Sequence, residues 1–375
     1  MGLGAIVVVG AQNQAFGPSA LEGSESPSRL AQHLSCVEIL GCSMLDRTIE
    51  RLLAAEVELV SVLVADEFDT APQLPAKFKN VKVEVVNDLG AATTRLFREY
   101  VQSGLDHSFV ISANLYAETD LLDLFYFHRE GQQKVTRTHD SQGPLELWVV
   151  DCAKAQYADA CDLLGPSSNG CSSNAGSSNG GSPNQAASYF VREYVSRLAH
   201  PRELRRIACD ALRGRCAMRP SGQEIRPGIF IEDGAEVHRR ARVVAPAYIG
   251  RGTKVKEDTL ITRCSTVERG CYVDAGTVIE DSSVLPNTHI GIWLDVCHGI
   301  ASGNKLFSLE RDVMVEISDS NVMRANGSAR KEARNARALN LANEKQQPAT
   351  AKVVDLQKET PAPEAWQLGA NPIQG

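Results

Sequence analysis

Every sixth residue between positions 231 and 285 is a branched aliphatic residue. The ten members of this series are Ile231, Val237, Val243, Ile249, Val255, Ile261, Val267, Val273, Ile279 and Leu285. If such residues make up roughly a quarter of an ordinary chain, ten in a row arise by chance about once in a million. Nine of the ten residues four positions further on are small, and the series is Ala235, Ala241, Ala247, Thr253, Thr259, Ser265, Cys271, Thr277, Ser283 and His289. A period of six residues therefore predicts a repeated structural unit.

The two series predict a left-handed parallel β-helix over residues 231–290. Three short strands make one triangular coil of about eighteen residues, with the aliphatic side chains stacked inside and the small residues at the corners. Its left-handed crossovers are an exception to the right-handed rule for parallel strands. His289 is too large for the small-residue series and follows Pro286, so we expect the regular coils to end there. Trp293 is then expected to cap the end of the prism.

Composition excludes several classes of protein. The net charge of −7 argues against binding to nucleic acid, which requires a basic surface. The ten cysteines include no Cys-x-x-Cys pair and no zinc-type spacing, which favours reduced thiols in a reducing compartment. The apolar run Ala5–Val9 is too short to span a membrane and is typical of a buried strand. We therefore expect a cytoplasmic protein without a membrane span.

Short apolar runs alternate with amphipathic segments over the first 165 residues. The expected strands are residues 6–9, 60–64, 81–86, 109–112 and 145–150, and the expected helices are residues 44–55, 91–101 and 121–128. In the second of these helices, Leu96, Phe97 and Tyr100 are spaced to face inward. Strands that alternate with helices predict an α/β sheet with helices on its faces.

These patterns divide the chain into five segments. Residues 1–165 are expected to form the α/β domain, and residues 166–188 a Gly/Ser/Asn-rich linker or loop. Residues 189–228 are predicted to be a helical connector, with the helix itself over Tyr189–Arg213. Residues 229–322 hold the β-helix and its C-terminal cap. Residues 323–375 are polar and are expected to be a disordered tail.

The repeat resembles the hexapeptide-repeat superfamily, which implies a trimer packed side by side along the prism. The N-terminal region resembles sugar-1-phosphate nucleotidyltransferases in five stretches, which are Gly4–Ala11, Leu40–Leu52, Asn87–Thr93, Phe109–Asn114 and Leu121–Glu130. The resemblance implies a Rossmann-like nucleotidyltransferase fold. It also implies formation of an NDP-sugar and pyrophosphate from an NTP and a sugar 1-phosphate, in a sugar-nucleotide pathway.

The resemblance implies a nucleotide or sugar-nucleotide pocket at the carboxyl ends of the strands. Its candidate residues are Gly10, Ala11, Gln12, Asn13, Gln14 and Gly90. The reaction is the attack of a sugar phosphate on the α-phosphorus of an NTP, which needs cations on the phosphates and a metal for the developing charge. An active protein would therefore require Mg²⁺.

The catalytic elements that the resemblance implies are altered in this sequence. The family's Gly-Gly-x-Gly-Thr-Arg loop corresponds to residues 10–17, which contain no arginine, and its two motif lysines correspond to Leu34 and Cys42. Its metal-binding Gly-Asp corresponds to Ala113 and Asn114, and an amide lacks the negative charge that a hard cation prefers. Each lost phosphate-clamping group costs about a hundredfold in rate. We therefore expect lost or weak catalysis with retained binding and assembly.

Three alternatives stay open. One is an active nucleotidyltransferase whose diverged loops are compensated elsewhere. Another is a hexapeptide-repeat acyltransferase, which would need a histidine as general base, and the candidates are His238, His298 and, at the end of the repeat, His289. A histidine on the surface of a repeat is more often solvated than catalytic. The third is a purely structural assembly subunit.

Overall fold

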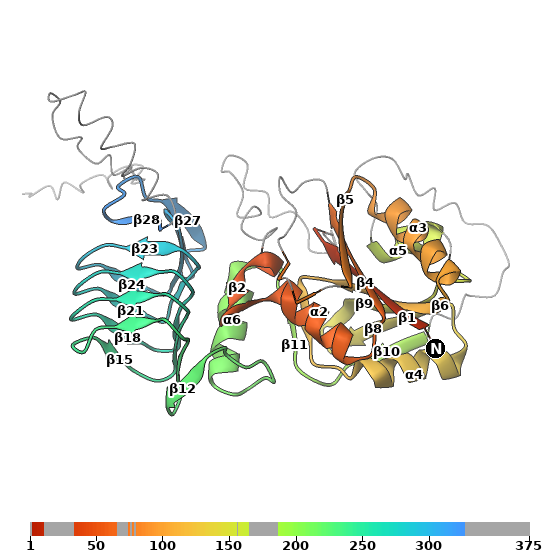
Figure 1. The fold of residues 1–375 in the computed structure, drawn as a ribbon, viewed down its shortest axis with the longest axis horizontal. Coiled ribbons are helices and arrows are strands. Elements are labelled where there is room, and N and C mark those ends of the chain that lie inside the picture. Colours follow the sequence, from red (N-terminus) through yellow and green to blue (C-terminus); the bar gives the residue numbers. More distant parts are fainter. Residues whose placement is uncertain are drawn as a thin grey trace, which may run out of the picture. The chain divides into compact units, whose positions relative to one another are not determined.

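The computed structural model describes residues 2–10, 34–65, 74–75, 77–78, 80–155, 157–164 and 187–326. All of them belong to one compact unit within residues 1–332. They form an N-terminal α/β region and a C-terminal region of many short strands in parallel sheets (Figure 1). Residues 166–186 of the expected linker and the tail beyond Asn326 lie outside the described residues. No described helix is both long enough and apolar enough to cross a membrane.

A seven-stranded mixed sheet forms the centre of the N-terminal region. In spatial order its strands are β10 (Ala187–Phe190), β8 (Val135–Asp140), β9 (Gly143–Asp151), β6 (Leu105–Ser112), β1 (Gly2–Val9), β4 (Leu59–Ala65) and β5 (Val81–Val86). The four strands from β6 to β5 are parallel, and Val7 of β1 pairs with Ile111 and Val62. Because helices cover both faces of this part, β1 and β4 are nearly continuous apolar runs. All five predicted strands are present, and β8 and β10 extend the sheet.

Helices cover each face of the sheet in pairs. The helices α2 (Met44–Ala54) and α4 (Leu121–Gly131) pack on the face that carries Val7, and α3 (Leu89–Gln102) and α5 (Tyr157–Leu164) pack on the face that carries Ile6. Side chains at the N-caps accept hydrogen bonds from the first turn of α2, α3 and α4. The three predicted helices are confirmed, and Leu96, Phe97 and Tyr100 are buried as expected.

The helix predicted over Tyr189–Arg213 is wrong in its first half. Strand β10 joins the edge of the large sheet beside β8, and β11 (Val195–Arg197) pairs with β7 (Leu115–Ala117). The helix α6 (Pro201–Leu212) begins only after His200, whose side chain caps it, with proline in its first turn. Both strands are held by partners far away in sequence, which local periodicity does not reveal.

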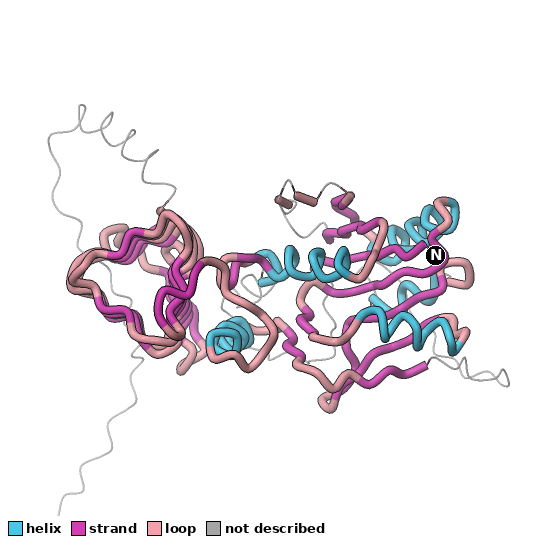
Figure 2. Tube along the Cα trace, turned by 60° about the horizontal axis from the view of Figure 1, so that its bottom comes forward, coloured by secondary structure: helices cyan, strands magenta, loops and turns pink. Residues whose placement is uncertain are grey.

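The C-terminal region consists of three parallel sheets around one apolar interior (Figure 2). The first sheet holds β13 (Ile229–Ile231), β16 (Ala247–Ile249), β19 (Ser265–Val267), β22 (Ser283–Val284) and β25 (Gly299–Ser302). The second holds β14 (Glu236–Val237), β17 (Lys254–Val255), β20 (Tyr272–Val273) and β23 (Thr288–Ile290). The third holds β15 (Arg242–Val243), β18 (Leu260–Thr262), β21 (Val278–Glu280) and β24 (Asp295–Cys297). Successive strands pair with the predicted aliphatic residues in register, such as Val237 with Val255, so this arrangement is compatible with a β-helix.

Within the predicted series, the six-residue spacing breaks once, after Ile279. Val267 pairs with Val284 and Ile279 pairs with Val296, so these partners are 17 residues apart instead of 18. Val284 therefore points into the interior in place of Leu285, which lies outside it in a second apolar cluster with Tyr248 and other residues. The inward position predicted for Leu285 is wrong because the unit after Ile279 has five residues.

The same shift explains the misfit of His289. Thr288 is fully buried, and its hydroxyl accepts a hydrogen bond from Gly303 N at 2.9 Å, so a small residue continues the corner series. Parallel pairing then continues through β24 and β25. The predicted end of the regular coils near residue 290 is therefore too early.

Antiparallel strands close the upper end of the coils. Strands β26 (Lys305–Ser308) and β27 (Val313–Glu316) extend the first sheet, and β28 (Met323–Ala325) pairs with β23. Met323 is buried in the coil interior, whereas Trp293 is 75% exposed and packs against Gly276 on the outside. The cap predicted at Trp293 is thus wrong. At the other end, β12 (Gln223–Arg226) pairs with β13.

Candidate functional site

The carboxyl edge of the large sheet brings together predicted site residues that are far apart in sequence. Gly10 directly follows β1, and Asn114 follows the neighbouring strand β6 after one intervening residue. Gly90 follows β5 at the start of α3. Because these strands are parallel, all three residues lie along the same edge. The other predicted loop residues, Ala11 to Gln14, lie outside the described residues.

Gly90 lies in the first turn of α3, and the N-cap of this helix, Asp88, carries a negative charge. Asp88 caps α3 and its carboxylate accepts a hydrogen bond from Ala91 N at 2.9 Å. Gly90 is buried, and its carbonyl accepts a hydrogen bond from the Thr94 hydroxyl at 2.8 Å. Helix N-termini attract anions, but here the Asp88 carboxylate occupies that place. This helix start is therefore better suited to a base or a ribose than to a phosphate.

Asn114 presents a neutral acceptor at the edge. Its side-chain oxygen is buried and has no hydrogen-bond partner among the described residues. Its backbone is fixed on both sides, because its N–H lies 3.3 Å from the Ser112 hydroxyl and its carbonyl accepts from Leu198 N at 2.7 Å. A buried acceptor without a partner is costly in a folded protein, so a donor from a ligand would stabilise it.

The described residues do not fit a Mg²⁺ site. Among them, no group of three or more His, Cys, Asp or Glu side chains is placed to hold a metal ion. Asn114 offers a single uncharged oxygen, whereas Mg²⁺ prefers carboxylates and phosphates. The residues at the two lysine positions of the resemblance do not replace a cation either, because Leu34 is buried in an apolar cluster and burial raises the pKa of the Cys42 thiol to about 11.

The stretch Leu40–Leu52, the second of those that resemble nucleotidyltransferases, contacts the parallel-sheet region. Strands β2 (Glu38–Ile39) and β3 (Cys42–Ser43) form a hairpin whose two turn residues, Leu40 and Gly41, both have positive φ. The Glu268 carboxylate, at the end of β19, accepts hydrogen bonds from Leu40 N at 2.8 Å and Gly41 N at 3.1 Å. Glu268 is 1% exposed, and its burial raises its pKa to about 8.

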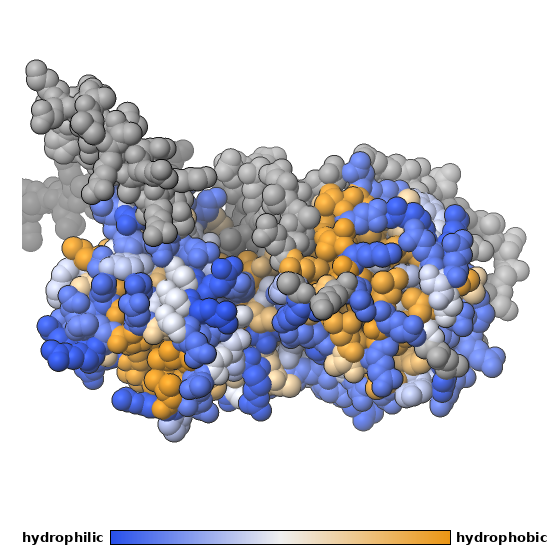
Figure 3. Space-filling view, viewed as in Figure 1, coloured by the Kyte–Doolittle hydropathy of each residue, from blue (hydrophilic) through white to orange (hydrophobic). Residues whose placement is uncertain are grey.

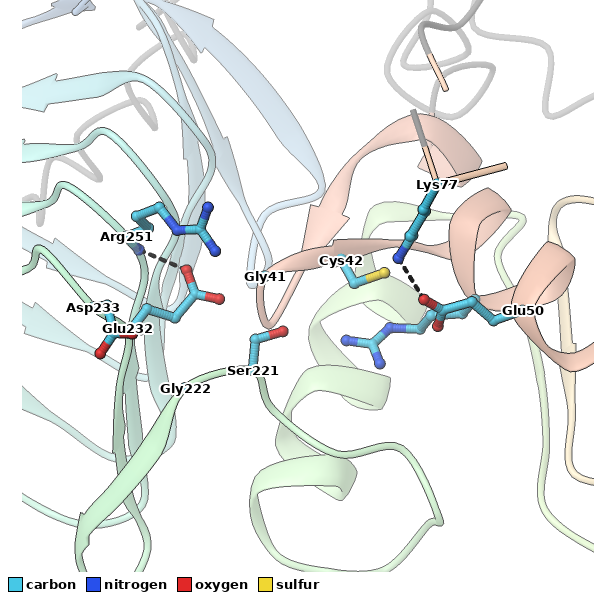
Figure 4. A pocket seen from close by; sticks show the side chains of 10 residues that line it. Gly41, Cys42, Glu50, Lys77, Ser221, Gly222, Glu232, Asp233 and Arg251 are labelled. Atoms are coloured by element: carbon cyan, nitrogen blue, oxygen red, sulfur yellow. Dashed lines mark hydrogen bonds and ion pairs between the residues drawn. The ribbon is translucent and has the colours of Figure 1, made fainter. Parts of the chain in front are cut away.

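A polar pocket of about 380 Å³ lies beside this hairpin (Figure 4). It is lined by Gly41, Cys42, Arg47, Glu50, Lys77, Ser221, Gly222, Glu232, Asp233 and Arg251. Lys77 Nζ lies 2.5 Å from the Glu50 carboxylate, and the Glu232 carboxylate accepts a hydrogen bond from the backbone N–H of Arg251 at 2.7 Å. The sequence did not predict this pocket, since its lining comes from five separate stretches that share no motif.

The candidate histidines differ in their surroundings. His298 Nδ1 lies 2.8 Å from Asp281 Oδ2, and Asp281 also accepts a hydrogen bond from Arg205 at 2.8 Å. A carboxylate that orients an imidazole is the usual arrangement for a general base. His238 is exposed, and its Nδ1 accepts from Arg240 N at 3.3 Å. His289 is buried, and desolvation lowers its pKa.

No protein-family model matches the chain, and a comparison with curated proteins finds no match.

Proposed function

We propose that this chain is a sugar-nucleotide-pathway protein of the nucleotidyltransferase type with little or no turnover. In this proposal the α/β region binds a nucleotide or sugar nucleotide at its carboxyl edge, and the parallel-sheet region is a left-handed β-helix that assembles copies of the chain. The observation that carries the proposal is Asn114, whose buried side-chain oxygen has no hydrogen-bond partner among the described residues. A base or sugar hydroxyl could donate to it, whereas Mg²⁺ chemistry would need a carboxylate.

The contacts of the stretch Leu40–Leu52 support the proposal of weak catalysis. Its turn is held by Glu268, and Arg47 of α2 donates to Ile39 O at 3.0 Å and Arg219 O at 3.3 Å. The guanidinium of Arg47 is thus occupied by backbone carbonyls. This stretch therefore contributes to packing against the parallel-sheet region, in place of binding phosphates.

Assembly is supported by the outer face of the third sheet. Leu260 and Val278 are paired in register on neighbouring strands and are half-buried, and Val244 beyond β15 is 43% exposed. Figure 3 shows apolar side chains gathered on the lower coils of this region. Contiguous exposed apolar surface is typical of an interface. We propose that second and third copies of the chain cover this face in a homotrimer.

Ligand binding is tested by thermal shift and calorimetry with NTPs and NDP-sugars, with and without Mg²⁺. We expect at least one of these ligands to stabilise the protein without Mg²⁺, and no pyrophosphate-linked turnover. In Asn114→Asp, binding should become dependent on Mg²⁺, whereas Asn304→Asp, which lies outside this edge, should bind as the wild type does. Failure of every nucleotide and sugar nucleotide to bind would refute the proposal. Turnover by the wild type would show an active enzyme instead.

Assembly is tested by light scattering of the whole chain. We expect a trimer for the wild type and dissociation for Val244→Glu, because a carboxylate on the apolar face would be buried without a partner. Lys256→Glu, on a different sheet, should leave the trimer intact. A wild-type monomer at micromolar concentration would contradict the proposed assembly.

Acyl transfer is a second candidate, favoured by the pairing of His298 with Asp281. An acyltransferase would use His298 Nε2 as general base, because Nδ1 faces the carboxylate. Calorimetry with acetyl-CoA tests this reading. Binding that is accompanied by acyl transfer and lost in His298→Ala would support it, and no binding would exclude it for this acyl donor.

A further inference from the structure

Helix α6 and its C-cap residue present two arginines and a cysteine to one corner of the coils. Arg205, Cys209 and Arg213 are spaced four residues apart, so they share one face of the helix. Arg205 donates to Cys264 O at 2.7 Å and to Arg263 O at 3.2 Å, which fixes this face against the corner between β18 and β19. One turn further along, the Cys209 thiol is in side-chain contact with Cys264, and so is the Arg213 guanidinium.

The two thiols differ in their exposure to solvent and in their pKa. Cys264 is fully buried, whereas Cys209 is partly exposed and offers access from solvent. The contact with Cys209 and the guanidinium groups of Arg213 and Arg205 lower the pKa of Cys264, and the same contact raises the pKa of Cys209. Burial raises the pKa of the six other cysteines that the structure describes.

We propose that Cys209 and Cys264 form a modification site that reacts with low-molecular-weight disulfides, such as oxidised glutathione, to give an intramolecular disulfide. Both cysteines are reduced in the structure described here, and they are adjacent through the packing of α6. The bond would link α6 to the corner of the coils. The site is separate from the carboxyl edge of the sheet, so this proposal does not depend on the proposed function.

The reaction is a thiol–disulfide exchange in two steps. When Cys209 has lost its proton and Cys264 keeps its own, the Cys209 thiolate attacks one sulfur of the small disulfide, whose S–S bond breaks. The first leaving thiolate takes a proton from water, and Cys209 carries a mixed disulfide. Cys264 then loses its proton and attacks Cys209 Sγ, and the second leaving thiolate takes up that proton. Two cysteine sulfurs are oxidised, and one small disulfide is reduced to two thiols.

The position of α6 gives this bond a structural consequence. Leu204, Ile207 and Ala208 of α6 belong to a buried cluster that also contains Tyr116 of the α/β region and Tyr248 of the parallel-sheet region. A disulfide between residues 209 and 264 would close a long loop and restrict the unfolded chain. We therefore expect the oxidised protein to melt several degrees higher than the reduced protein.

The test treats the whole chain with oxidised glutathione and maps its peptides without reduction. We expect one linked peptide that joins Cys209 to Cys264, lighter by about 2 Da than the two free peptides together. In Cys264→Ser the linked peptide should be absent and Cys209 should keep a stable glutathione adduct. Cys297→Ser removes an exposed thiol outside the pair and should leave the link unchanged.

A further variant tests whether the charge of Arg213, and not only the proximity of the two thiols, speeds the reaction. Arg213 is exposed, so Arg213→Gln should fold normally and should slow formation of the link by about fivefold, because less thiolate is present. A persistent adduct on Cys209 in the wild type, a link between other cysteines, or no reaction at all would overturn the proposal. A link that leaves the melting temperature unchanged would overturn the expected clamping of α6.

Discussion

Glu268 shows how one carboxyl group couples two distant parts of the chain. It is buried, and it accepts both N–H groups of the turn at Leu40 and Gly41, while Glu38 and Glu232 lie near enough to oppose its ionisation. Burial dominates, so its pKa rises from 4.5 to about 8. The folded and unfolded states therefore bind this proton with different affinities, so the free energy of unfolding depends on pH.

We expect the wild type to lose stability as pH rises from about 5 to 8. The folded protein holds the Glu268 proton up to about pH 8, whereas the unfolded chain releases it near its ordinary value of 4.5. The folded state thus binds more protons in this range, and the free energy of unfolding falls with pH. Glu268→Gln removes this dependence, so the stability difference between wild type and variant should shrink as pH rises. Urea unfolding at several pH values measures it.

The control for this prediction is Glu236→Gln. Glu236 is exposed and pairs with Lys254 at 2.9 Å, and exposed pairs contribute about 0–1 kcal/mol. Its variant should therefore keep the wild-type dependence on pH. A stability difference between wild type and Glu268→Gln that stays constant from pH 5 to 8 would contradict the assignment to Glu268.

At the scale of elements, the docking of α6 depends on one buried arginine. Arg205 is 5% exposed and joins the helix to Arg263 O, Cys264 O and Asp281. Its neighbour Arg206 is about half exposed and pairs with Glu203 within the helix. Both residues are arginines in the same helix, so their alanine variants form a matched pair.

We expect Arg205→Ala to cost about 2–4 kcal/mol, since it leaves buried carbonyls without donors and Asp281 without its guanidinium partner. Arg206→Ala should change stability by about 0.5 kcal/mol or less, because its pair is exposed. Urea unfolding measures both. Equal effects of the two variants would show that α6 does not depend on this contact.

The stacked interior predicts a large effect at the middle of the coils. Ile261 is fully buried and pairs with Val243 on one side and Ile279 on the other. Ile261→Ala should destabilise the protein by about 2–5 kcal/mol, because a cavity remains between two rigid layers. Arg242→Ala, on the outer face of the neighbouring strand, should cost far less. A small effect at Ile261, measured by denaturant unfolding, would contradict the inward position.

The elements that the sequence predicted are those with a strong local signal. The helices α2, α3 and α4, the four strands of the parallel centre and β9 have clear periodicity. Strands β10 and β11 lack such a signal, and their partners β8 and β7 lie far away in sequence. The five-residue unit after Ile279 was missed because Leu285 and Val284 are both aliphatic, so the pattern alone allows either to point inward.

At the scale of the molecule, one buried cluster joins the α/β region to the parallel-sheet region. Met44 and Tyr116 come from the first region, Tyr248 and Phe307 come from the second, and α6 contributes Leu204 between them. Tyr248 is fully buried and lies beside Gly41, where an added Cβ would be 2.5 Å from its hydroxyl. The two regions thus share a core and should unfold together.

We expect a single unfolding transition in the wild type, with Tyr248→Ala lowering the stability of both regions by about 3–5 kcal/mol. Trp148 lies in the α/β region and Trp293 in the parallel-sheet region, so variants that keep one tryptophan report on each region by fluorescence. The two midpoints should coincide before and after the mutation. Separate midpoints in the wild type would show that the regions unfold independently.

The candidate site was predicted in part. Gly10, Gly90 and Asn114 lie on one sheet edge as the resemblance implied, because parallel strands bring their carboxyl ends together. The pocket beside Gly41 was not predicted, since no local pattern reports on contacts between residues 41, 77, 222 and 251. The docking of the hairpin on Glu268 was missed for the same reason.

The sequence by itself determined the features that repeat or that depend on near neighbours. Aliphatic residues at a six-residue spacing define parallel coils, and apolar periodicity defines the helices and central strands, because each residue's environment is set by residues close to it in the chain. The tertiary structure alone decided which units of the repeat have five residues, where Glu268 holds the hairpin, and which cysteines become neighbours. These depend on contacts across up to 228 residues, such as that between Leu40 and Glu268, and burial and charge at such contacts arise only when the chain is folded.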